Sequence, residues 1–320
     1  MMRQLLNLAV VAVAVAGGSL PAVAQETLKV AIGQISNWEN QAPTLGQEVG
    51  IFKKHGLVLE TLSTAGGGET MQPVISGAVD IGIGVGAAGI MRAFSTGAPV
   101  RILTPAFTGT GDTFWYVRAD SPIKTLADAT DKTTIAYSTN GSSTHSVVLA
   151  FVNELGVKAK PTATGSPAGT LTALMSGQID IGWSSPPVAL QEVRDGKVRM
   201  VARGSDAPSL RAQTMRVTIV NAETLRRRPE AVARFVAAYR EALDWMYSDP
   251  KALELYAKKI NKPLELVKYT VDQFYPKSAL QTDQMADIDG IVRDAVKLKF
   301  LKEPLSKEQL TELVWIPPRQ

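Results

Sequence analysis

Cysteine is absent from this chain of 320 residues, and histidine occurs only twice, as His55 and His145. The lack of cysteine excludes disulfides, thiolate nucleophiles and cysteine-ligated metals together. Two histidines are also too few for a multi-histidine metal centre, although carboxylate ligands remain available. We therefore expect a protein that uses neither a cofactor nor a bound metal.

The chain also lacks a strong excess of charge. Its 34 Lys and Arg residues against 30 Asp and Glu residues give a net charge of +4, and the only basic tract is Arg226-Arg227-Arg228. A nucleic-acid-binding protein usually carries a denser basic stripe, so we expect no nucleic-acid partner. Hydrophobic residues make up 45%, which is enough for buried cores, and the length suits about two domains.

A long hydrophobic run occurs only at the N-terminus. Residues 1–24 contain Arg3, an apolar stretch from Leu5 to Ala16, and Ala22-Val23-Ala24 at the end. A positive start, a short apolar segment and an A-x-A end are typical of a cleavable secretory signal peptide. A membrane anchor is the alternative, but residues 17–21 interrupt the apolar segment, which is then too short to span a bilayer. Export without disulfides favours the bacterial periplasm.

After this segment, strands and helices are predicted to alternate. Such alternation with short loops indicates a parallel α/β sheet with helices on both faces. The expected strands include residues 28–32, 58–63 and 79–83, and the expected helices include residues 44–54, 69–75 and 87–95.

One heptapeptide recurs along the chain. Ser76-Gly77-Ala78-Val79-Asp80-Ile81-Gly82 and Ser176-Gly177-Gln178-Ile179-Asp180-Ile181-Gly182 are identical at five of seven positions. In each copy a glycine follows an apolar helix pattern, as in a left-handed helix cap, and an apolar strand comes next. We expect the two aspartates to serve the turn or the strand edge. The repeat suggests two similar α/β lobes, and a chance match is the alternative.

Two segments rich in Pro, Gly and small polar residues, 105–112 and 205–209, predict where the lobes join. We expect lobe 1 to comprise residues 25–107 and 214–320, and lobe 2 to comprise residues 108–213. Two crossings of this kind permit hinge closure over a cleft. From residue 222 onward the pattern predicts a nearly all-helical C-terminal extension.

The order of these segments resembles a known family. Residues 49–60, the glycine-rich turn 66–68 and the Ser-Gly-x-x-Asp-Ile-Gly motif are similar to periplasmic solute-binding proteins of ABC importers. The resemblance is to the sulfonate, nitrate and taurine group with its thiamine-pyrimidine-like relatives, and it covers residues 28–247. It implies the type II periplasmic-binding-protein fold, with two lobes and two crossover hinges. It also implies an ABC permease in the inner membrane as a partner.

One predicted loop is suited to binding an anion. In open α/β sheets, ligands bind at the carboxyl ends of strands, next to helix N-termini, where free N–H groups favour negative charge. Residues 138–145 occupy such a position, and among them we select Ser138 and Asn140. Sulfonate-type relatives carry a similar Gly-Ser-Ser-x-His run, and this resemblance implies ligand contacts for Gly141, Ser142, Ser143 and His145. The alternative is an ordinary N-cap that satisfies its own helix.

Further candidates lie in the neighbouring loops. Trp38 and Trp183 are expected to face each other and clamp a carbon chain or ring, and core packing is the alternative. Glu69 is a candidate for binding an amine, or else it favours its own helix start. Arg211 and Arg216 flank the second connector and are candidates for an acid group, or else they are solvated. The other candidate ligand-binding residues are Asn37, Gly67, Gly68, Ala87, Thr108, Ser184 and Ser185.

The run Gly84-Val85-Gly86-Ala87-Ala88-Gly89 supplies an alternative function. It follows the G-x-G-x-x-G pattern between a strand and a helix, which is the context of a dinucleotide site, so the alternative is an exported nucleotide-binding oxidoreductase. However, the run follows the third strand rather than the first, and no acidic strand end follows about 20 residues later. A pyrimidine synthase of the same fold would need a cysteine-rich motif, and no G-x-S-x-G hydrolase motif is present.

These patterns together predict a binding protein rather than an enzyme. We expect a periplasmic monomer that captures a small anion in the cleft between the lobes and delivers it to the permease. Alkanesulfonates, taurine, nitrate and aromatic acids are the candidate ligands.

Overall fold

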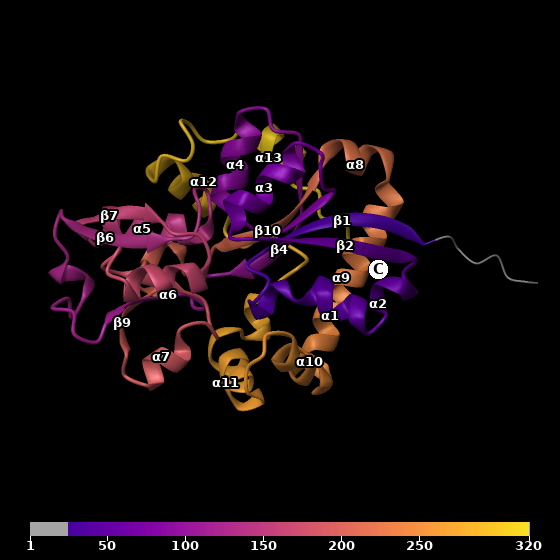
Figure 1. The fold of residues 1–320 in the computed structure, drawn as a ribbon. Helices are drawn as coiled ribbons and strands as arrows, with labels where there is room; N and C mark the ends of the chain where they lie inside the picture. Colours follow the sequence, from indigo (N-terminus) through magenta and orange to yellow (C-terminus); the bar gives the residue numbers. More distant parts are fainter. Residues whose placement is uncertain (1–24, 320) are drawn as a thin grey trace, which may run out of the picture.

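The computed structural model describes residues 25–319, so the predicted signal peptide, residues 1–24, lies outside the described residues. Two lobes lie side by side, and the chain crosses between them twice (Figure 1). Lobe 1 contains a five-stranded sheet, and lobe 2 contains the strands that lie between the two crossings. The architecture is the predicted two-lobed α/β fold.

Lobe 1 is built on a sheet of strand order β2-β1-β3-β10-β4. Strands β2, β1 and β3 are parallel, whereas β10 returns from lobe 2 and runs antiparallel to both of its neighbours. The sheet is buried on both faces, since Val30 and Ile32 of β1 belong to one hydrophobic cluster and Ala31 belongs to the other. The strands are β1 (Glu26–Gly33), β2 (Leu57–Thr64), β3 (Ile81–Gly86), β4 (Val100–Thr108) and β10 (Thr214–Asn221).

Helices cover both faces of this sheet, as buried parallel strands require. Helices α1, α2, α9, α10 and α11 share one hydrophobic cluster, and α3, α4, α12 and α13 share the other (Figure 1). The helices of lobe 1 are α1 (Ala42–Glu48), α2 (Ile51–Lys54), α3 (Gly67–Ile75), α4 (Ala87–Ser95), α8 (Ala222–Arg227), α9 (Pro229–Ser248), α10 (Lys251–Lys259), α11 (Leu264–Phe274), α12 (Ile288–Lys297) and α13 (Lys307–Leu313).

One predicted helix differs from the structure. The apolar pattern over residues 44–54 predicts a single helix, but the chain forms α1 and α2 instead. Gly50 between them has a φ of 83°, which is the left-handed conformation that ends helices.

Lobe 2 repeats the strand order of lobe 1 on a smaller scale. Strands β8, β5 and β9 form one sheet, β6 and β7 form a parallel pair, and a bridge between Ile135 and Ile181 joins the two. The combined order is β7-β6-β8-β5-β9, with an antiparallel strand in the fourth place, as in lobe 1. The elements are β5 (Phe114–Arg118), β6 (Thr133–Tyr137), β7 (Ala159–Ala163), β8 (Gly182–Ser184), β9 (Val198–Arg203), α5 (Ser143–Glu154), α6 (Pro167–Met175) and α7 (Leu190–Arg194).

The recurring heptapeptide has the same role in both lobes. Gly77 and Gly177 follow α3 and α6 with φ values of 75° and 74°. Asp80 accepts a hydrogen bond of 2.8 Å from a backbone N–H of β1, and Asp180 accepts one of 2.8 Å from a backbone N–H of β6. The predicted role of both aspartates at a strand edge is therefore confirmed, and the repeat is structural.

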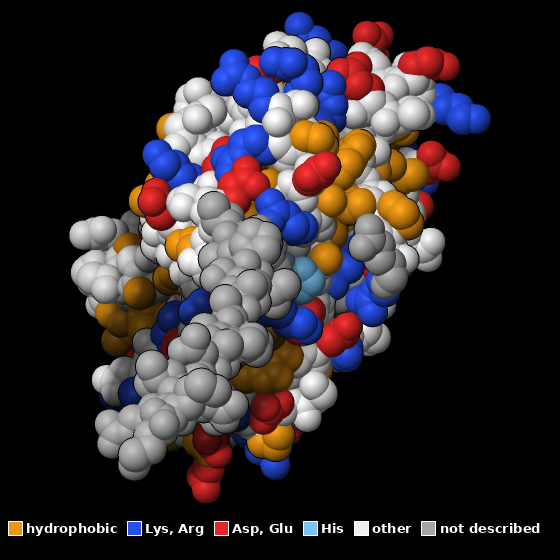
Figure 2. All heavy atoms as spheres, turned by 90° about the vertical axis from the view of Figure 1, so that its right-hand side faces the viewer, with side chains coloured by type: hydrophobic (Ala, Val, Ile, Leu, Met, Phe, Trp, Pro, Cys, Tyr) orange, Lys and Arg blue, Asp and Glu red, His pale blue; other side chains and the backbone are white. Residues whose placement is uncertain are grey.

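The end of lobe 1 that faces away from lobe 2 carries charges of both signs (Figure 2). The basic tract of α8 lies among acidic partners. Arg226 pairs with Glu223 at 2.6 Å, Arg227 pairs with the same carboxylate, and Arg228 pairs with Glu26 at 2.6 Å. These ion pairs offset much of the positive charge of the tract.

Candidate functional site

The two lobes touch at the ends of their strands. Gly68, in the first turn of α3, donates its backbone N–H to Thr139 Oγ1 of lobe 2 at 3.0 Å. A Cβ at Gly68 would lie 2.1 Å from the carbonyl oxygen of Asn140, and a Cβ at Gly89 in α4 would lie 2.1 Å from that of Gly141. No side chain fits at such distances, so glycine lets lobe 1 lie directly against the lobe 2 backbone. The structure therefore shows the lobes in a closed arrangement, and we call this contact the seam.

The seam gives the G-x-G-x-x-G run a structural use. A Cβ at Gly86 would lie 2.4 Å from the carbonyl oxygen of Gly141, which is also the atom that faces Gly89. The strand that carries the run, β3, is the middle strand of its sheet and the third along the chain. Packing between the lobes thus accounts for Gly86 and Gly89 without a dinucleotide, and Gly84, with a φ of 77°, lies against Asn40 of its own lobe.

The residues of the predicted anion loop bond mainly to one another. Ser142 Oγ accepts the backbone N–H of His145 at 3.1 Å, as the N-cap of α5. Gly141 donates its N–H to His145 Nδ1 at 3.2 Å, and the Tyr137 hydroxyl donates to Asn140 Oδ1 at 2.6 Å. Local capping therefore accounts for much of this loop, and its contact with a ligand stays a prediction.

The remaining residues of this loop differ in what they reach. Ser138 is buried and its Oγ lies 3.0 Å from Thr144 Oγ1, within the same loop. Burial, together with the positive charge of Arg92, lowers the pKa of His145 to about 4, so its imidazole is neutral at neutral pH. Ser143 reaches lobe 1, since its Oγ lies 3.4 Å from Arg216 Nη1.

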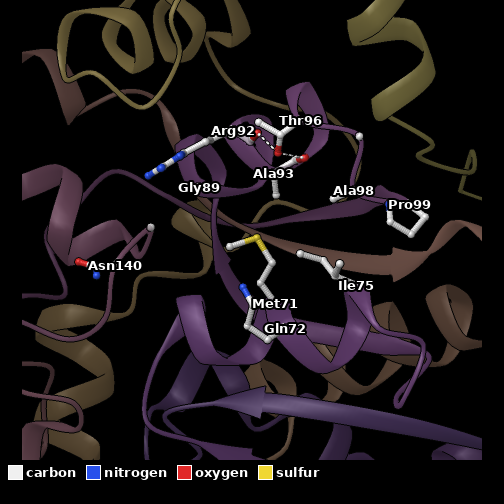
Figure 3. A pocket seen from close by; sticks show the side chains of 12 residues that line it. Met71, Gln72, Ile75, Gly89, Arg92, Ala93, Thr96, Ala98, Pro99 and Asn140 are labelled. Carbon is white, nitrogen blue, oxygen red and sulfur yellow. Dashed lines mark hydrogen bonds between the residues drawn. The ribbon is translucent and has the colours of Figure 1, made fainter.

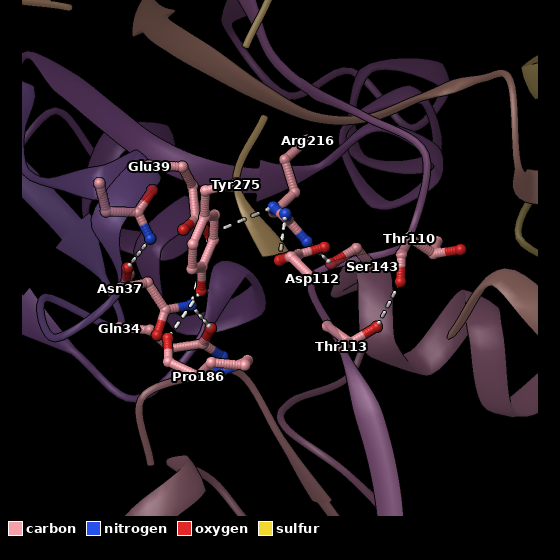
Figure 4. A network of polar contacts seen from close by, with 12 residues as sticks. Gln34, Asn37, Glu39, Thr110, Asp112, Thr113, Ser143, Pro186, Arg216 and Tyr275 are labelled. Carbon is pink, nitrogen blue, oxygen red and sulfur yellow. Dashed lines mark hydrogen bonds and ion pairs between the residues drawn. The ribbon is translucent and has the colours of Figure 1, made fainter. Parts of the chain in front are cut away.

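Arg216 of β10 lies at the centre of a buried polar network between the lobes (Figure 4). Its Nη2 donates to Asp112 Oδ2 at 2.6 Å, and its Nε lies 3.6 Å from Glu39 Oε1. The guanidinium also stacks over the ring of Phe107 at 4.4 Å. The side chains of Arg216, Glu39 and Asp112 are 7%, 0% and 0% exposed. The network thus joins the loop after β1, the first connector and the strand that leaves the second connector.

Two carboxyl groups share one guanidinium in this network. Burial raises the pKa of Glu39 to about 7, while Arg216 acts against this rise and Asp112 adds to it. Burial also raises the pKa of Asp112 above its ordinary value, despite the ion pair. Burial alone would lower the pKa of Arg216, but Asp112 and Glu39 raise it. Arg216 is therefore permanently charged, and Glu39 titrates near neutral pH.

Both predicted tryptophans are fully buried. Trp38 packs against Tyr247 of α9 and Tyr256 of α10, with ring centroids 5.8 and 5.1 Å apart. Trp183 of β8 lies opposite Trp115 of β5 in the sheet of lobe 2. The two tryptophans therefore occupy core positions in their own lobes, which was the alternative to a clamp.

A tyrosine from the C-terminal extension also crosses between the lobes. Tyr275, directly after α11, donates its hydroxyl to the carbonyl oxygen of Pro186 in lobe 2 at 2.9 Å (Figure 4). On the same side of the network, Asn37 Nδ2 lies 3.1 Å from Gln34 Oε1 and 3.3 Å from Glu39 Oε1. Asn37 therefore belongs to the network, and its contact with a ligand stays a prediction.

Several other predicted residues have local partners. Glu69 accepts the backbone N–H of Ala65 at 3.0 Å, at the start of its own helix. Arg211 is exposed and bonds to the carbonyl oxygen of Ser205. Ser184 Oγ donates to the carbonyl oxygen of Val188 at 2.8 Å. Gly67 packs against β3, Ala87 begins α4, and the hydroxyls of Thr108 and Ser185 are buried without a partner in the described structure.

Reasoning from the sequence missed Glu39, Asp112 and Tyr275. The loop that holds Glu39 supplied Asn37 and Trp38 as candidates, and the connector that holds Asp112 was predicted as a junction between the lobes, but the acid of neither segment was selected. A buried ion pair between such distant segments leaves no local pattern in the sequence.

A separate cavity lies outside the network, at the rim of the seam (Figure 3). It has a volume of about 510 Å³ and is lined by α3, α4 and the segment after it, together with Asn140 and Gly141 of lobe 2. Arg92 is its only charged lining residue. Two predicted ligand residues, Asn140 and Gly141, therefore line this outer cavity rather than the network around Arg216.

Within residues 25–319, no group of three or more His, Asp and Glu side chains is arranged to hold a metal ion. In the same part of the chain, no helix has the length and apolar character needed to cross a membrane.

Solved structures share this fold. The alkanesulfonate-binding protein SsuA from Xanthomonas axonopodis pv. citri, bound to MOPS, has a TM-score of 0.74 at 17% identity, over 94% of this chain and 100% of that one. The periplasmic nitrate-binding protein NrtA from Synechocystis PCC 6803 has a TM-score of 0.67 at 15% identity, over 90% and 84%. The fold is thus that of the periplasmic binding proteins, as predicted.

The sequence itself places the chain in a family. Its residues 38–253 match the NMT1/THI5-like family, and the chain belongs to that family. Curated relatives from Brucella abortus and Brucella suis, each named "Putative binding protein", are 26% identical over 253 residues, which cover 76% of this chain and 76% of each relative. The predicted resemblance is therefore confirmed at the level of the family.

Proposed function

We propose that this chain is the solute-binding component of an ABC importer and that it captures a small solute with an acid group between its lobes. It acts in the periplasm as a monomer after removal of residues 1–24, and it hands the solute to a permease without chemical change. Alkanesulfonates, taurine, nitrate and aromatic acids are the candidate solutes. The NMT1/THI5-like family and the alkanesulfonate- and nitrate-binding neighbours support this class of function.

One observation carries the proposal. Arg216 is a buried cation of lobe 1 that lies 3.4 Å from Ser143 in the first turn of α5 in lobe 2. A guanidinium is well suited to bind a carboxylate or sulfonate through paired N–H donors, and the helix N-terminus adds positive potential. Because these two groups meet only when the lobes are together, an acid bound to both stabilises the closed state relative to the open one.

A ligand screen on the chain without residues 1–24 tests this function. Ethanesulfonate, nitrate, benzoate, taurine, amino acids and pyrimidines are compared by thermal shift, where a solute at 100 times its Kd adds about 2.7 kcal/mol of stability. We expect at least one acid to raise Tm and to reduce the radius of gyration in small-angle scattering. A panel in which no acid binds, or in which a solute is turned over, contradicts the proposal.

Substitution of two arginines locates the acid group. Arg216→Lys keeps the charge but loses the paired donors, so we expect it to weaken binding of the acid. Arg211→Met is the matched test of the other arginine selected from the sequence, which is exposed in the structure. Loss of binding in Arg211→Met with no change in Arg216→Lys would show that Arg216 is not the acid-binding group.

A further inference from the structure

Four buried oxygen acceptors near the seam lack a hydrogen-bond partner in the described part of the chain. They are Asn37 Oδ1, Glu39 Oε2, Asn40 Oδ1 and Asp112 Oδ1, and each of these residues is at most 2% exposed. Buried polar atoms in folded proteins are nearly always paired. Acceptors without a partner at the junction of two closing lobes therefore point to donors that arrive with a bound molecule.

The two asparagine oxygens are fixed as acceptors by the bonds of their amide nitrogens. Asn37 Nδ2 donates to Gln34 Oε1 and Glu39 Oε1, and Asn40 Nδ2 donates to the carbonyl oxygen of Gly33 at 2.6 Å. Exchanging nitrogen and oxygen in either amide would place two acceptors against each other. The free oxygens therefore need N–H or O–H donors from elsewhere.

The charges of the network point in the same direction. Within residues 25–319, Arg216 is the one cation that acts on Glu39 and Asp112. It bonds to one oxygen of Asp112 and faces one oxygen of Glu39. The second oxygen of each carboxyl group, Glu39 Oε2 or Asp112 Oδ1, has no hydrogen-bond partner in the described residues. With both carboxyl groups ionised, the three side chains carry a net charge of −1. A solute that brought only negative charge would add to this imbalance and would leave the acceptors unpaired.

We propose that the solute is amphoteric: besides its acid group it carries a cationic N–H group, such as an ammonium, which Asn37, Glu39 and Asp112 accept. The acid group then lies toward Arg216 and Ser143, and the cationic group lies toward the two carboxylates. This inference rests on the proposed function, since it specifies the solute of the same cleft. Among the candidate solutes it favours taurine and amino-substituted acids over nitrate and simple alkanesulfonates.

The pH dependence of binding distinguishes the two kinds of solute. Glu39 faces Arg216 of β10, Asp112 of the first connector, Tyr239 and Tyr247 of α9, Tyr256 of α10 and Tyr275. Ordinary tyrosines stay neutral below pH 9, so among these groups Glu39 is the one that changes charge near neutral pH. An acid without an amine is held best when Glu39 is protonated, so its affinity falls as pH rises through 7. An ammonium favours ionised Glu39, so the affinity of an amphoteric solute does not fall.

Matched pairs of solutes test the proposal by calorimetry. Each pair differs only in an amine: ethanesulfonate with taurine, propionate with β-alanine, and 4-methylbenzoate with 4-(aminomethyl)benzoate. In at least one pair we expect the amphoteric member to bind at least about tenfold more tightly, since a charge-assisted hydrogen bond to a buried carboxylate is worth that factor or more. Ethylamine and benzylamine serve as cations without an acid.

Variants then assign the effect to the carboxyl groups. Glu39→Gln and Asp112→Asn should remove the preference for the amphoteric member, whereas Glu60→Gln, which changes an exposed acid of β2 outside the network, should keep it. Circular dichroism checks that each variant is folded, and the comparison of pairs on the unmodified chain stands even where a variant is not.

The outcomes separate this inference from the proposed function. If the acid of every pair binds as tightly as its amphoteric partner, the inference fails and the proposed function stands. If the amines bind as tightly as the amphoteric solutes, the carboxylates bind the cation but the acid-binding function fails, and with it the amphoteric assignment. If no member of any pair binds but nitrate or another acid of the panel does, the inference fails and the proposed function stands. If no acid of the panel binds, both are overturned.

Discussion

The first turns of α3 in lobe 1 and α6 in lobe 2 have the same internal hydrogen bonds but different surfaces. Thr70 Oγ1 lies 2.7 Å from Thr64 Oγ1 in lobe 1, and Thr170 Oγ1 lies 2.6 Å from Thr164 Oγ1 in lobe 2, at positions 100 residues apart. The preceding residues are Gly66-Gly67-Gly68 in lobe 1 and Ser166-Pro167-Ala168 in lobe 2.

The difference follows from what each turn touches. In lobe 1, Gly68 lies against the backbone of lobe 2, where a Cβ has no room. In lobe 2, Ser166 caps α6 by accepting the N–H of Gly169 at 3.2 Å, and Pro167 takes the first helical position. The repeat thus specifies how each lobe folds, and the residues at the strand ends specify how the lobes meet.

The largest expected effect concerns the junction itself. Arg216→Met leaves two buried carboxyl groups without their cation, so we expect the free energy of unfolding to fall by about 3–5 kcal/mol. Arg118→Met is the matched change within lobe 2, because it removes an ion pair on the surface. Arg118 lies 3.1 Å from Asp120, and the two side chains are 43% and 72% exposed. That variant should lose less than about 1 kcal/mol in urea denaturation. Equal losses would show that the junction is no more sensitive than the surface.

A second test uses pH to compare the junction with the surface. Because the pKa of Glu39 is raised from 4.5 to about 7, the folded chain holds this proton longer than the unfolded chain does. Stability from this group is therefore present at low pH and is lost as pH rises from 4.5 to 7. The difference in Tm between Glu39→Gln and the unmodified chain should therefore be more favourable to the variant at pH 8 than at pH 4.5.

The matched surface acid behaves differently. A hydrogen bond from Arg226 lowers the pKa of the exposed Glu223 to about 2. Stability from this group is present above pH 4.5 and is lost as pH falls from 4.5 to about 2, so Glu223→Gln should leave the profile between pH 4.5 and 8 nearly unchanged. A profile that is altered by Glu223→Gln and not by Glu39→Gln contradicts the assignment of the titrating group.

A third test separates the closing of the lobes from their folding. Gly89→Ala places a methyl group against the carbonyl oxygen of Gly141, and overpacking of this kind costs about 1–3 kcal/mol in the closed state. We expect the affinity for the solute to fall about 5- to 100-fold in calorimetry. Thermal unfolding without solute should change less, because alanine favours helices more than glycine does. Gly169→Ala, where the nearest atoms are 3.4 and 3.5 Å from the new Cβ, should keep the affinity.

The smallest effect tests the shared frame. Thr70→Val and Thr170→Val each remove one buried hydroxyl with two partners, so each should cost about 1 kcal/mol in urea denaturation. The double variant should show additive losses, since the two sites are independent. A large loss in one lobe and none in the other would show that the equivalent threonines do not have equivalent roles.

Much of the fold could be predicted from the sequence because its signals are local. Alternating strands and helices and the recurring heptapeptide each depend on neighbouring residues. The error over residues 44–54 arose at Gly50, since a glycine in an apolar helix pattern either continues the helix at a cost or ends it. The packing of α2 decided between continuing the helix and ending it.

The candidate site could be predicted only in part. Loops at strand ends are easy to locate, and Asn37 was selected from one of them, whereas Arg216 was selected because it flanks the second connector. The roles of Glu39 and Asp112 depend on three segments that lie 73 and 104 residues apart along the chain and meet only in the folded protein. In the loop 138–145 the local pattern is present but fits two roles. Hydroxyl residues that are suited to binding an anion are equally suited to capping α5.

The glycines of the seam set a mechanical limit on the protein. Main chain meets main chain there, so shutting the lobes freezes few rotatable bonds and carries a small entropic cost. The same contact limits how far the lobes can close, because peptide groups are more rigid than long side chains. On the proposed function, the seam and not the solute then sets the depth of the space between the lobes, and solutes are selected by whether they fit within that depth.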